Sequence, residues 1–544
     1  MSSATASKSS SSKSRTASTA AAAAANASSS SATSKNPLKG AVEIIPDRLY
    51  YCALKTPPSN PKILLRSRRD SSRKLPTICF NIDDELVYWN FFLDFGPLNL
   101  GQLYRFTIHL NELLNEYPNT NILFYSSPDP AKRANAAFLI CAWQVLELKR
   151  TPDQAYYGFT ALMKMGNGTK RRDGDDGGAA GSDDEVPPPP PTGGSSYCRP
   201  PCYPLSPIGR LTVAPLPYWH DASPCQCTYK LNLYDCLLAI VKAQEYKFFD
   251  WDTFDVEEYE YFEQVENGDL NWIMKGKILA FAGPSYKKTV SPEGYCTLAP
   301  ADYIPYFKKK KVGLVVRLNK KNYEEQDFID AGIQHLEQYY LDGSCPPMKI
   351  LQKVLAEFES VKSDEAFAVH CKAGLGRTGT CIGAYIMKHY RLTAPEVIAW
   401  MRICRPGCVI GPQQQFLEDL QPVMWQEGEL MRTSLTANQI SDTTRGRNSG
   451  KSSSSKSKSS NSRSPRTSRK SPPSPESPKS VTVNDESIEG RPGQADGLLA
   501  RRNRQTRATT AAAAAVTTTT PATPNSMKDG MSGGRKPVPV TPDS

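Results

Sequence analysis

Residues 370–379 read His370-Cys371-Lys372-Ala373-Gly374-Leu375-Gly376-Arg377-Thr378-Gly379. The apolar run Phe367-Ala368-Val369 precedes this stretch and is typical of a buried strand, because it is short and follows the polar residues 362–365. From Thr380 to Tyr390, apolar side chains recur at helical spacing. The stretch is therefore expected to connect the end of a strand to the start of a helix, where free backbone N–H groups and the helix dipole favour an anion.

The residue types in this loop fit phosphate chemistry. A cysteine near a helix N-terminus and cationic groups is expected to ionise, so Cys371 is the predicted nucleophile that attacks phosphorus. Arg377 can grip two phosphate oxygens with its planar guanidinium. Thr378 is expected to stabilise the leaving thiolate, and His370 to orient the loop. The residues predicted to bind phosphate are Lys372, Ala373, Gly374, Leu375, Gly376 and Arg377.

A buried structural cysteine is the alternative interpretation. A bare cysteine followed six positions later by arginine would allow it. The preceding histidine, the three glycines and the Arg377-Thr378-Gly379 ending favour the catalytic interpretation.

Two further loops supply candidate catalytic groups. Asp342 lies in a turn-rich segment and is the candidate general acid for the leaving oxygen, although Asp-Gly pairs often only form turns. Gln413 and Gln414, in the segment 409–416, are candidates for placing the water that hydrolyses phosphocysteine. Amides at a solvated helix start are the alternative for this pair.

With these motifs in place, the chain resembles the cell-division-cycle-fourteen family of dual-specificity phosphatases, which reverse phosphorylation by cyclin-dependent kinases. The resemblance covers approximately residues 38–430. The segments that carry it, beside residues 370–379, are Tyr303-Ile304-Pro305-Tyr306-Phe307, Arg317-Leu318-Asn319, Asp342-Gly343-Ser344, Ile386-Met387-Lys388-His389-Tyr390, Arg402-Ile403-Cys404-Arg405-Pro406-Gly407, Ile410-Gly411-Pro412-Gln413-Gln414-Gln415, Leu233-Tyr234-Asp235-Cys236 and Glu266-Asn267-Gly268-Asp269-Leu270-Asn271-Trp272.

The resemblance implies two tandem phosphatase-like domains, the first of them inactive, with a substrate groove between them. It also implies phosphoserine or phosphothreonine followed by proline as substrate, with a basic residue a few positions later, and phosphotyrosine as well. Acids are then needed near the groove, and the candidates are Glu260, Glu263 and Asp302. The strand-like run 121–125, the turn 126–130 and the helix after it repeat the order around Cys371, but without a cysteine or an Arg-Thr-Gly ending.

Composition completes the predicted organisation, which is an α/β fold with tails that cannot bury enough apolar surface to order. The predicted parts are a tail at 1–37, an inactive domain at 38–283 with an insertion at about 166–196, a linker with a helix at 284–311, the catalytic domain at 312–432 and a tail at 433–544. Much of the excess positive charge behind the net +11 lies in the tails, which favours solvated disorder, with localisation signals and chromatin association as the alternatives, over nucleic-acid binding by a folded face.

No cofactor, metal or membrane insertion is predicted, and nucleic acid is not the expected substrate. Cys198, Cys202, Cys225 and Cys227 could be imagined as a zinc site, but their spacing is unusual for one. The Ser- and Lys-containing N-terminus also has a composition found in transit peptides, with low-complexity disorder as the favoured interpretation. The resemblance is compatible with nuclear, nucleolar, cytoplasmic, centrosomal or spindle positions.

The expected partners are phosphoproteins with Ser-Pro sites and proline-directed kinases. Such kinases would act on the Ser-Pro pairs at Ser464, Ser471, Ser474 and Ser477. Three other functions use related chemistry or a related site. A phosphoinositide phosphatase would gain from a lysine where Leu375 stands, and an RNA 5′-triphosphatase would be expected beside a nucleotidyltransferase domain. A non-catalytic phosphopeptide-binding scaffold would be expected to lose Cys371, Arg377 or Asp342.

Overall fold

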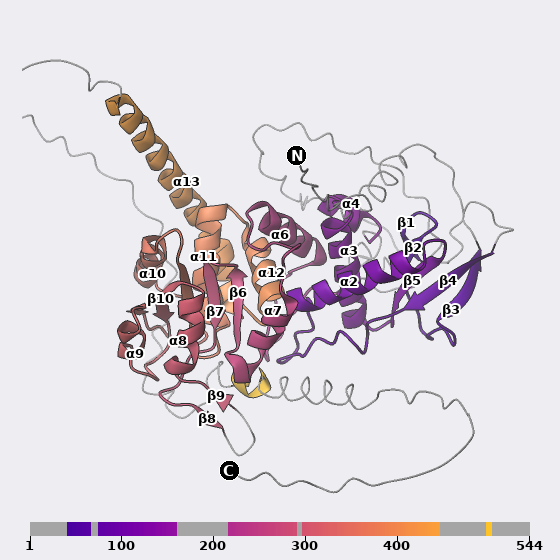
Figure 1. Cartoon of the computed structure of the whole chain (residues 1–544), viewed down its shortest axis with the longest axis horizontal. Helices are drawn as coiled ribbons and strands as arrows, with labels where there is room; N and C mark the ends of the chain where they lie inside the picture. The colour runs from indigo at the N-terminus through magenta and orange to yellow at the C-terminus, as the bar shows by residue number, and fades with distance from the viewer. Residues whose placement is uncertain (1–40, 67–73, 160–215, 291–295, 447–496, 503–544) are drawn as a thin grey trace, which may run out of the picture.

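The computed structural model describes residues 41–66, 74–159, 216–290, 296–446 and 497–502 of the chain. Two five-stranded sheets with flanking helices lie side by side (Figure 1). The N-terminal unit contains β1 (Val42–Ile45), β2 (Leu49–Ala53), β3 (Lys62–Arg66), β4 (Lys74–Phe80), α2 (Leu100–Glu116), β5 (Asn121–Ser126), α3 (Pro130–Leu146) and α4 (Pro152–Tyr157).

Two helices, α6 (Leu233–Glu245) and α7 (Val256–Glu263), follow the gap at 160–215 and lie between the units (Figure 1). The unit that is predicted to be catalytic, called the catalytic unit below, then contains β6 (Leu270–Met274), β7 (Ile278–Phe281), β8 (Thr289–Val290), β9 (Cys296–Thr297), α8 (Pro300–Lys309), β10 (Val312–Arg317), α9 (Gln326–Asp330), β11 (Gln334–Glu337), α10 (Met348–Ser360), β12 (Ala366–His370), α11 (Gly376–Tyr390), α12 (Ala394–Cys404) and α13 (Pro412–Gly446).

The two sheets share one plan. Their strand orders are β1-β2-β5-β4-β3 and β11-β10-β12-β7-β6. In each sheet the central strand, β5 or β12, is paired in parallel with both neighbours and leads into a helix that is buried along most of its length. The ends of such parallel strands are where α/β proteins bind ligands. The predicted fold class, two α/β units in tandem, is confirmed.

The predicted boundary between the units is wrong. Residues 270–281 were assigned to the inactive domain, but β6 and β7 belong to the catalytic sheet, where β7 pairs in parallel with β12. The reason is that a short apolar run such as Ile278–Phe281 suits either sheet, and its partner strand lies almost 90 residues further along the chain. The helix predicted around Tyr303 and Phe307 is present as α8.

The predicted C-terminal tail is also more ordered than expected. Helix α13 continues to Gly446, beyond the predicted end at 432, and its N-terminal part packs along α11. Residues 497–502 form a further helical turn, drawn in yellow below α7 (Figure 1), and Arg502 of this turn is paired with Asp269. The predicted insertion at 166–196, the tail 1–37, the Ser-Pro cluster, Cys198 and Cys202 lie outside the described residues.

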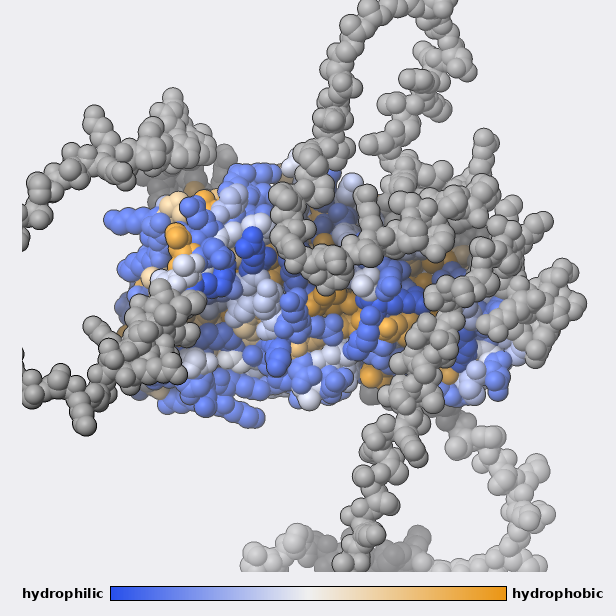
Figure 2. Space-filling view, turned by 90° about the horizontal axis from the view of Figure 1, so that it is seen from above, coloured by the Kyte–Doolittle hydropathy of each residue, from blue (hydrophilic) through white to orange (hydrophobic). Residues whose placement is uncertain are grey.

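One apolar core runs through both units. Trp143 of α3, Trp219 and Trp400 of α12 belong to the same buried cluster. Helix α6 contacts both α3 and α12, and an ion pair of 2.6 Å between Lys242 and Glu396 connects it to α12. Figure 2 shows a largely hydrophilic surface on the described residues, with hydrophobic ones gathered near the middle of this face. None of the described helices is both long and apolar enough to cross a membrane.

Candidate active site

The loop after β12 forms a cradle of backbone amides, residues 371–376, below the start of α11. Cys371 is 3% exposed at the end of the strand. The N-cap residue of α11, Leu375, offers no side-chain cap, so the first amides of the helix remain for an anion. Gly374 has φ +66°, and a β-carbon there would lie 1.9 Å from the carbonyl oxygen of Phe281. Only glycine therefore allows the cradle to pack this closely on β7.

Arg377 holds the cradle and the predicted acid loop together. Its Nη2 lies 3.0 Å from Oδ1 of Asp342, and its Nη1 donates to the carbonyl oxygen of Tyr340 at 2.9 Å. The hydroxyl of Tyr340 donates in return to the carbonyl oxygen of Arg377 at 3.1 Å. The Nε–H is buried and has no hydrogen-bond partner among the described residues, so it remains available to a phosphate oxygen. The two predicted catalytic side chains thus meet although they lie 35 positions apart.

His370 lies beneath the cradle, fully buried. Its Nδ1–H donates to the carbonyl oxygen of Cys371 at 2.9 Å, and Nε2 accepts from the hydroxyl of Tyr323 at 2.7 Å. Burial, together with the nearby cations Arg317 and Arg377, lowers the pKa of His370 to about 3. The imidazole is therefore neutral near pH 7 and can orient the loop without transferring protons.

Thr378 does not form the predicted bond to Cys371 in this structure. Its hydroxyl is buried and has no hydrogen-bond partner among the described residues. A buried hydroxyl without a hydrogen-bond partner costs folding free energy, and a catalytic role is one explanation for such a group. Its role when the thiolate leaves stays a prediction.

The two candidate glutamines have different surroundings. Gln413 lies against Gly376 of the cradle, donates to the carbonyl oxygen of Ser344 at 3.2 Å and accepts from the amide of Ile410 at 3.0 Å. One N–H and one lone pair of its carboxamide are thus used, which leaves one of each for a water. Gln414 faces away, with its oxygen bound by Arg402 at 2.7 Å. The geometry therefore favours Gln413 of the pair.

Sequence reasoning missed Arg405 as a support of the cradle. Its guanidinium is fully buried, and donates from Nε to the carbonyl oxygen of Gly374 at 2.8 Å and from Nη2 to that of Ala373 at 3.0 Å. Its Nη1 donates to the carboxylate of Asp269 and to the side chain of Asn271, both at 2.7 Å. Arg405 thus turns the carbonyls of the cradle away from the phosphate side. Both partners lie in segments that carried the resemblance, but no local pattern pairs them.

The predicted groove acids are dispersed. Glu260 is paired with Arg105, and Asp302 caps its own helix α8 and lies 3.7 Å from Lys288. Glu263 is bound by Asn99, and burial raises its pKa, an effect that the nearby Arg502 opposes.

An acid absent from the predicted set, Asp269, binds a cation from the C-terminal segment. Nε of Arg502 lies 2.7 Å from Oδ1 of Asp269, the oxygen that Arg405 also contacts. Leu498 is buried in the same segment, and the guanidinium of Arg501 stacks on Phe92. The negative charges of Asp269 and Glu263 both act on Arg502 and raise its pKa.

Comparison with known proteins matches both units to phosphatases. Residues 43–168 match the family described as dual specificity protein phosphatase, N-terminal half. Residues 294–391 match a family described as polymorphic toxin system, DSP-PTPase phosphatase.

Relatives from several animals extend the match over most of the chain. Human dual specificity protein phosphatase CDC14A is 43% identical over 406 residues, which are 74% of this chain and 57% of the relative. Zebrafish CDC14AB is 44% identical over 400 residues, 73% of this chain and 55% of the relative. The Caenorhabditis elegans tyrosine-protein phosphatase cdc-14 is 34% identical over 405 residues, 73% of this chain and 49% of the relative. The chain thus spans roughly half the length of these relatives, and within that span it belongs to the CDC14 family of dual-specificity protein phosphatases.

Proposed function

We propose that the chain is a cysteine-dependent protein phosphatase that hydrolyses phosphoserine and phosphothreonine before proline, and also phosphotyrosine. The observation that carries the proposal is the meeting of three groups at one cradle: Cys371 at its base, Arg377 beside it, and Asp342 at 3.0 Å from that guanidinium. A phosphate held by the amides of α11 and by Arg377 would have sulfur on one side and a carboxyl group on the other.

The reaction has two steps. In the first, the thiolate of Cys371 forms a bond to phosphorus while the bond from phosphorus to the substrate oxygen breaks, and the carboxyl group of Asp342 gives that oxygen a proton. In the second, water attacks the phosphocysteine, Asp342 takes up the proton, and the thiolate leaves. Gln413 is the candidate to hold this water, and Thr378 to donate to the departing sulfur.

Asp269 and Glu263 are the acids that would attract the basic residue after the proline of a peptide substrate. Arg502 supports this, because it is a guanidinium already bound at the carboxylate of Asp269. Leu375 supports a protein substrate over a phosphoinositide, since it is apolar and fully buried where a polyanionic headgroup would gain from a cation. The relatives' printed names, dual specificity and tyrosine-protein phosphatase, support activity on more than one phosphorylated residue.

The wider role follows from the resemblance. We place the enzyme in the reversal of cyclin-dependent kinase phosphorylation at mitotic exit and cytokinesis, in the nucleus or nucleolus and cytoplasm, including the centrosome or spindle. The serines at 464, 471, 474 and 477 would be targets of proline-directed kinases and substrates of the enzyme itself. Mass spectrometry of cells that carry Cys371→Ser should show higher phosphate occupancy there; unchanged occupancy at all four would contradict self-reversal.

The deciding experiment is a substrate panel with the purified full chain. It contains a phosphoserine-proline peptide with a basic residue, the same peptide with alanine in its place, a phosphotyrosine peptide, a phosphoinositide and a 5′-triphosphate RNA. We expect the highest kcat/KM for the basic phosphoserine-proline peptide. Faster hydrolysis of the lipid or the RNA would refute the proposal that proteins are the substrates. No hydrolysis of any substrate would refute the proposed phosphatase activity.

A further inference from the structure

The segment 216–232 reaches from the N-terminal side of the molecule to the loop that carries Gln413. Its Asp221 is 1% exposed, and Oδ2 accepts from the backbone amide of Gly411 at 2.6 Å. Oδ1 accepts from the hydroxyl of Ser223 at 3.0 Å. A buried carboxylate at such a short distance from a backbone N–H makes a strong, charge-assisted hydrogen bond.

Gly411 lies directly before α13, which begins at Pro412. It has φ +57°, so the chain turns sharply there, and Gln413 follows two positions later. The carboxylate of Asp221 therefore caps the N-terminus of α13 from 190 positions earlier in the chain. A negative charge is favoured at this end of a helix, and capping bonds fix where a helix begins. The bond consequently determines the position of the Gln413 backbone.

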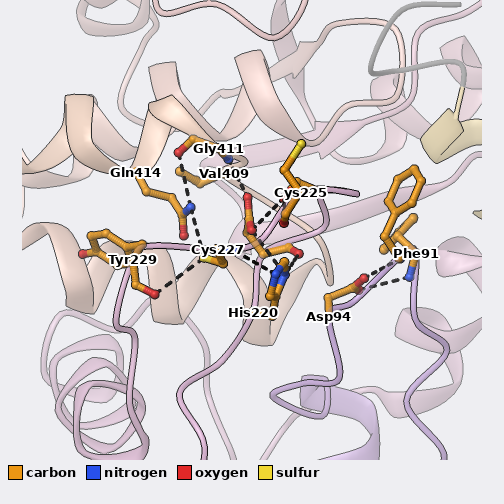
Figure 3. Close-up of polar contacts among 12 residues, drawn as sticks. Phe91, Asp94, His220, Cys225, Cys227, Tyr229, Val409, Gly411 and Gln414 are labelled. Atoms are coloured by element: carbon orange, nitrogen blue, oxygen red, sulfur yellow. Dashed lines mark hydrogen bonds and ion pairs between the residues drawn. The ribbon is translucent and has the colours of Figure 1, made fainter.

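The same segment is fixed by a second set of contacts (Figure 3). Nε2 of His220 accepts from the amide of Cys227 at 2.9 Å, which leaves the ring proton on Nδ1, where it donates to the carbonyl oxygen of Asp221 at 2.7 Å. Sγ of Cys227 lies 3.9 Å from Nε2 of Gln414. His220 and Cys227 thereby contact both Asp221 and Gln414, the residue that follows Gln413.

A metal site is the alternative for this cluster, since ligand atoms of His220, Asp221 and Cys227 lie within 4.8 Å of one another. Two observations oppose it. Nε2 of His220 already accepts a hydrogen bond and Nδ1 carries the proton, so neither ring nitrogen offers a free lone pair. Both oxygens of Asp221 accept hydrogen bonds as well. The cluster is satisfied as a hydrogen-bonded brace.

We propose that Asp221 is a positioning residue for the second step of the reaction, because it holds Gly411 and thereby the Gln413 carboxamide that orients the attacking water. This rests on the proposed function. The first step uses Cys371, Arg377 and Asp342, and none of the hydrogen bonds described for Asp221 involves them. Removing the carboxylate should therefore slow hydrolysis of phosphocysteine and leave its formation almost unchanged.

Rapid-quench kinetics with a radiolabelled phosphopeptide measure the two steps separately. For Asp221→Ala in the full chain, we expect phosphocysteine to form within about twofold of the wild-type rate and to hydrolyse roughly tenfold more slowly, the scale expected when a reacting group is displaced by less than 1 Å. Asp221→Asn keeps an oxygen that can accept from Gly411 and should lie between Asp221→Ala and wild type.

A control variant separates positioning from stability. Glu396→Gln removes the ion pair between Glu396 of α12 and Lys242 of α6, which includes no residue of the loop 409–416, and should lower the melting temperature without changing the ratio of the two rates. Equal slowing of both steps in the folded Asp221 variants, or an unchanged hydrolysis rate, would overturn the positioning role. Absence of phosphocysteine and of turnover in the wild type would instead refute the proposed function.

Discussion

In both units the central strand leads into a helix through a short connection, but the charged side chains that bind the backbone of this connection have opposite signs. In the N-terminal unit, three residues join β5 to α3, and two carboxylates take up the backbone amides there. Asp129 caps α3 by accepting from the amide of Lys132 at 2.9 Å, and Asp83 accepts from the amide of Ser127 at 2.7 Å. The site where an anion would bind is thus filled by the protein's own negative charges.

In the catalytic unit, five residues join β12 to α11, and no side chain caps the helix. A buried cation, Arg405, binds the carbonyls of the cradle from behind. The common topology supplies a ring of amides in both units. Whether that ring binds phosphate depends on the charge placed against it, and of the two connections only the second contains a cysteine.

The largest expected effect comes from making the second loop chemically more like the first. Cys371→Ser places at the base of the cradle the residue type found in the inactive connection, and should abolish turnover, because a serine hydroxyl does not ionise near neutral pH. Binding of a phosphopeptide should remain, as measured by isothermal titration calorimetry. Substantial turnover by the variant would show that Cys371 is not the nucleophile.

Asp342→Asn tests the predicted general acid, which belongs to the second unit. An alkoxide from phosphoserine is a poor leaving group, whereas nitrophenolate needs little help from an acid. The variant should therefore lose about 10²–10⁴-fold in kcat on a phosphoserine peptide and much less on nitrophenyl phosphate. Equal losses on both substrates would point to a structural role for the pair with Arg377.

Arg405→Met removes the cation behind the cradle and keeps most of its volume. The buried carboxylate of Asp269 then keeps, among the described residues, only Arg502 as a cationic partner, so we expect a loss in the free energy of unfolding of up to about 3–5 kcal/mol. The kcat per folded molecule should fall as well, because the Ala373 and Gly374 carbonyls lose their donors. The matched control is Arg133→Met in α3, also buried, which should affect stability alone. A stable, fully active Arg405→Met enzyme would contradict the support role.

The cradle was predictable from the sequence because its chemistry is local. Cysteine, glycines and arginine lie within ten residues, and an apolar strand precedes them. The residues that hold the cradle were not predictable, because Arg405 and Asp269 lie 136 positions apart, and Asp221 and Gly411 lie 190 apart. Neither pair shows in a periodic pattern. Asp302 is a candidate groove acid by the resemblance, yet its carboxylate caps helix α8. The predicted domain boundary at residue 283 is wrong because β7 pairs with β12, which lies far along the chain and cannot be identified as its partner from local sequence.

Two histidines, the buried His370 and the half-buried His335, should make the catalytic unit sensitive to acid. The pKa of His370 is lowered to about 3 and that of His335 to about 4, in both cases chiefly by burial. In the unfolded chain both titrate near 6.5, so the unfolded state binds more protons between these values. Stability should therefore fall as pH drops below 6.5, by at most about 1.4 kcal/mol per pH unit for each group, and be unaffected by these groups above it.

Urea unfolding of wild type and His370→Gln at pH 7, 6 and 5 measures this contribution. The variant lacks the hydrogen bonds to Tyr323 and Cys371 and should be less stable at pH 7. Its disadvantage should shrink as the pH falls, because it has no imidazole to protonate on unfolding. A difference that stays constant across the range would mean that His370 is not held neutral by burial.

The smallest effect belongs to the inactive connection. Asp129→Ala removes the cap of α3 and should cost about 1 kcal/mol of stability, the usual value of an N-cap side chain, with kcat unchanged. Asp83 still occupies the amide of Ser127, so the variant should gain no anion site. In thermal unfolding with tungstate, a phosphate mimic, both wild type and Asp129→Ala should be stabilised to the same extent, and Arg377→Ala should remove that stabilisation from each. Stabilisation by tungstate that survives in the double variant Asp129→Ala/Arg377→Ala would mean that the connection between β5 and α3 binds anions once the carboxylate of Asp129 is gone. In that case the carboxylate of Asp129, more than the length of the loop, keeps the N-terminal unit from binding phosphate.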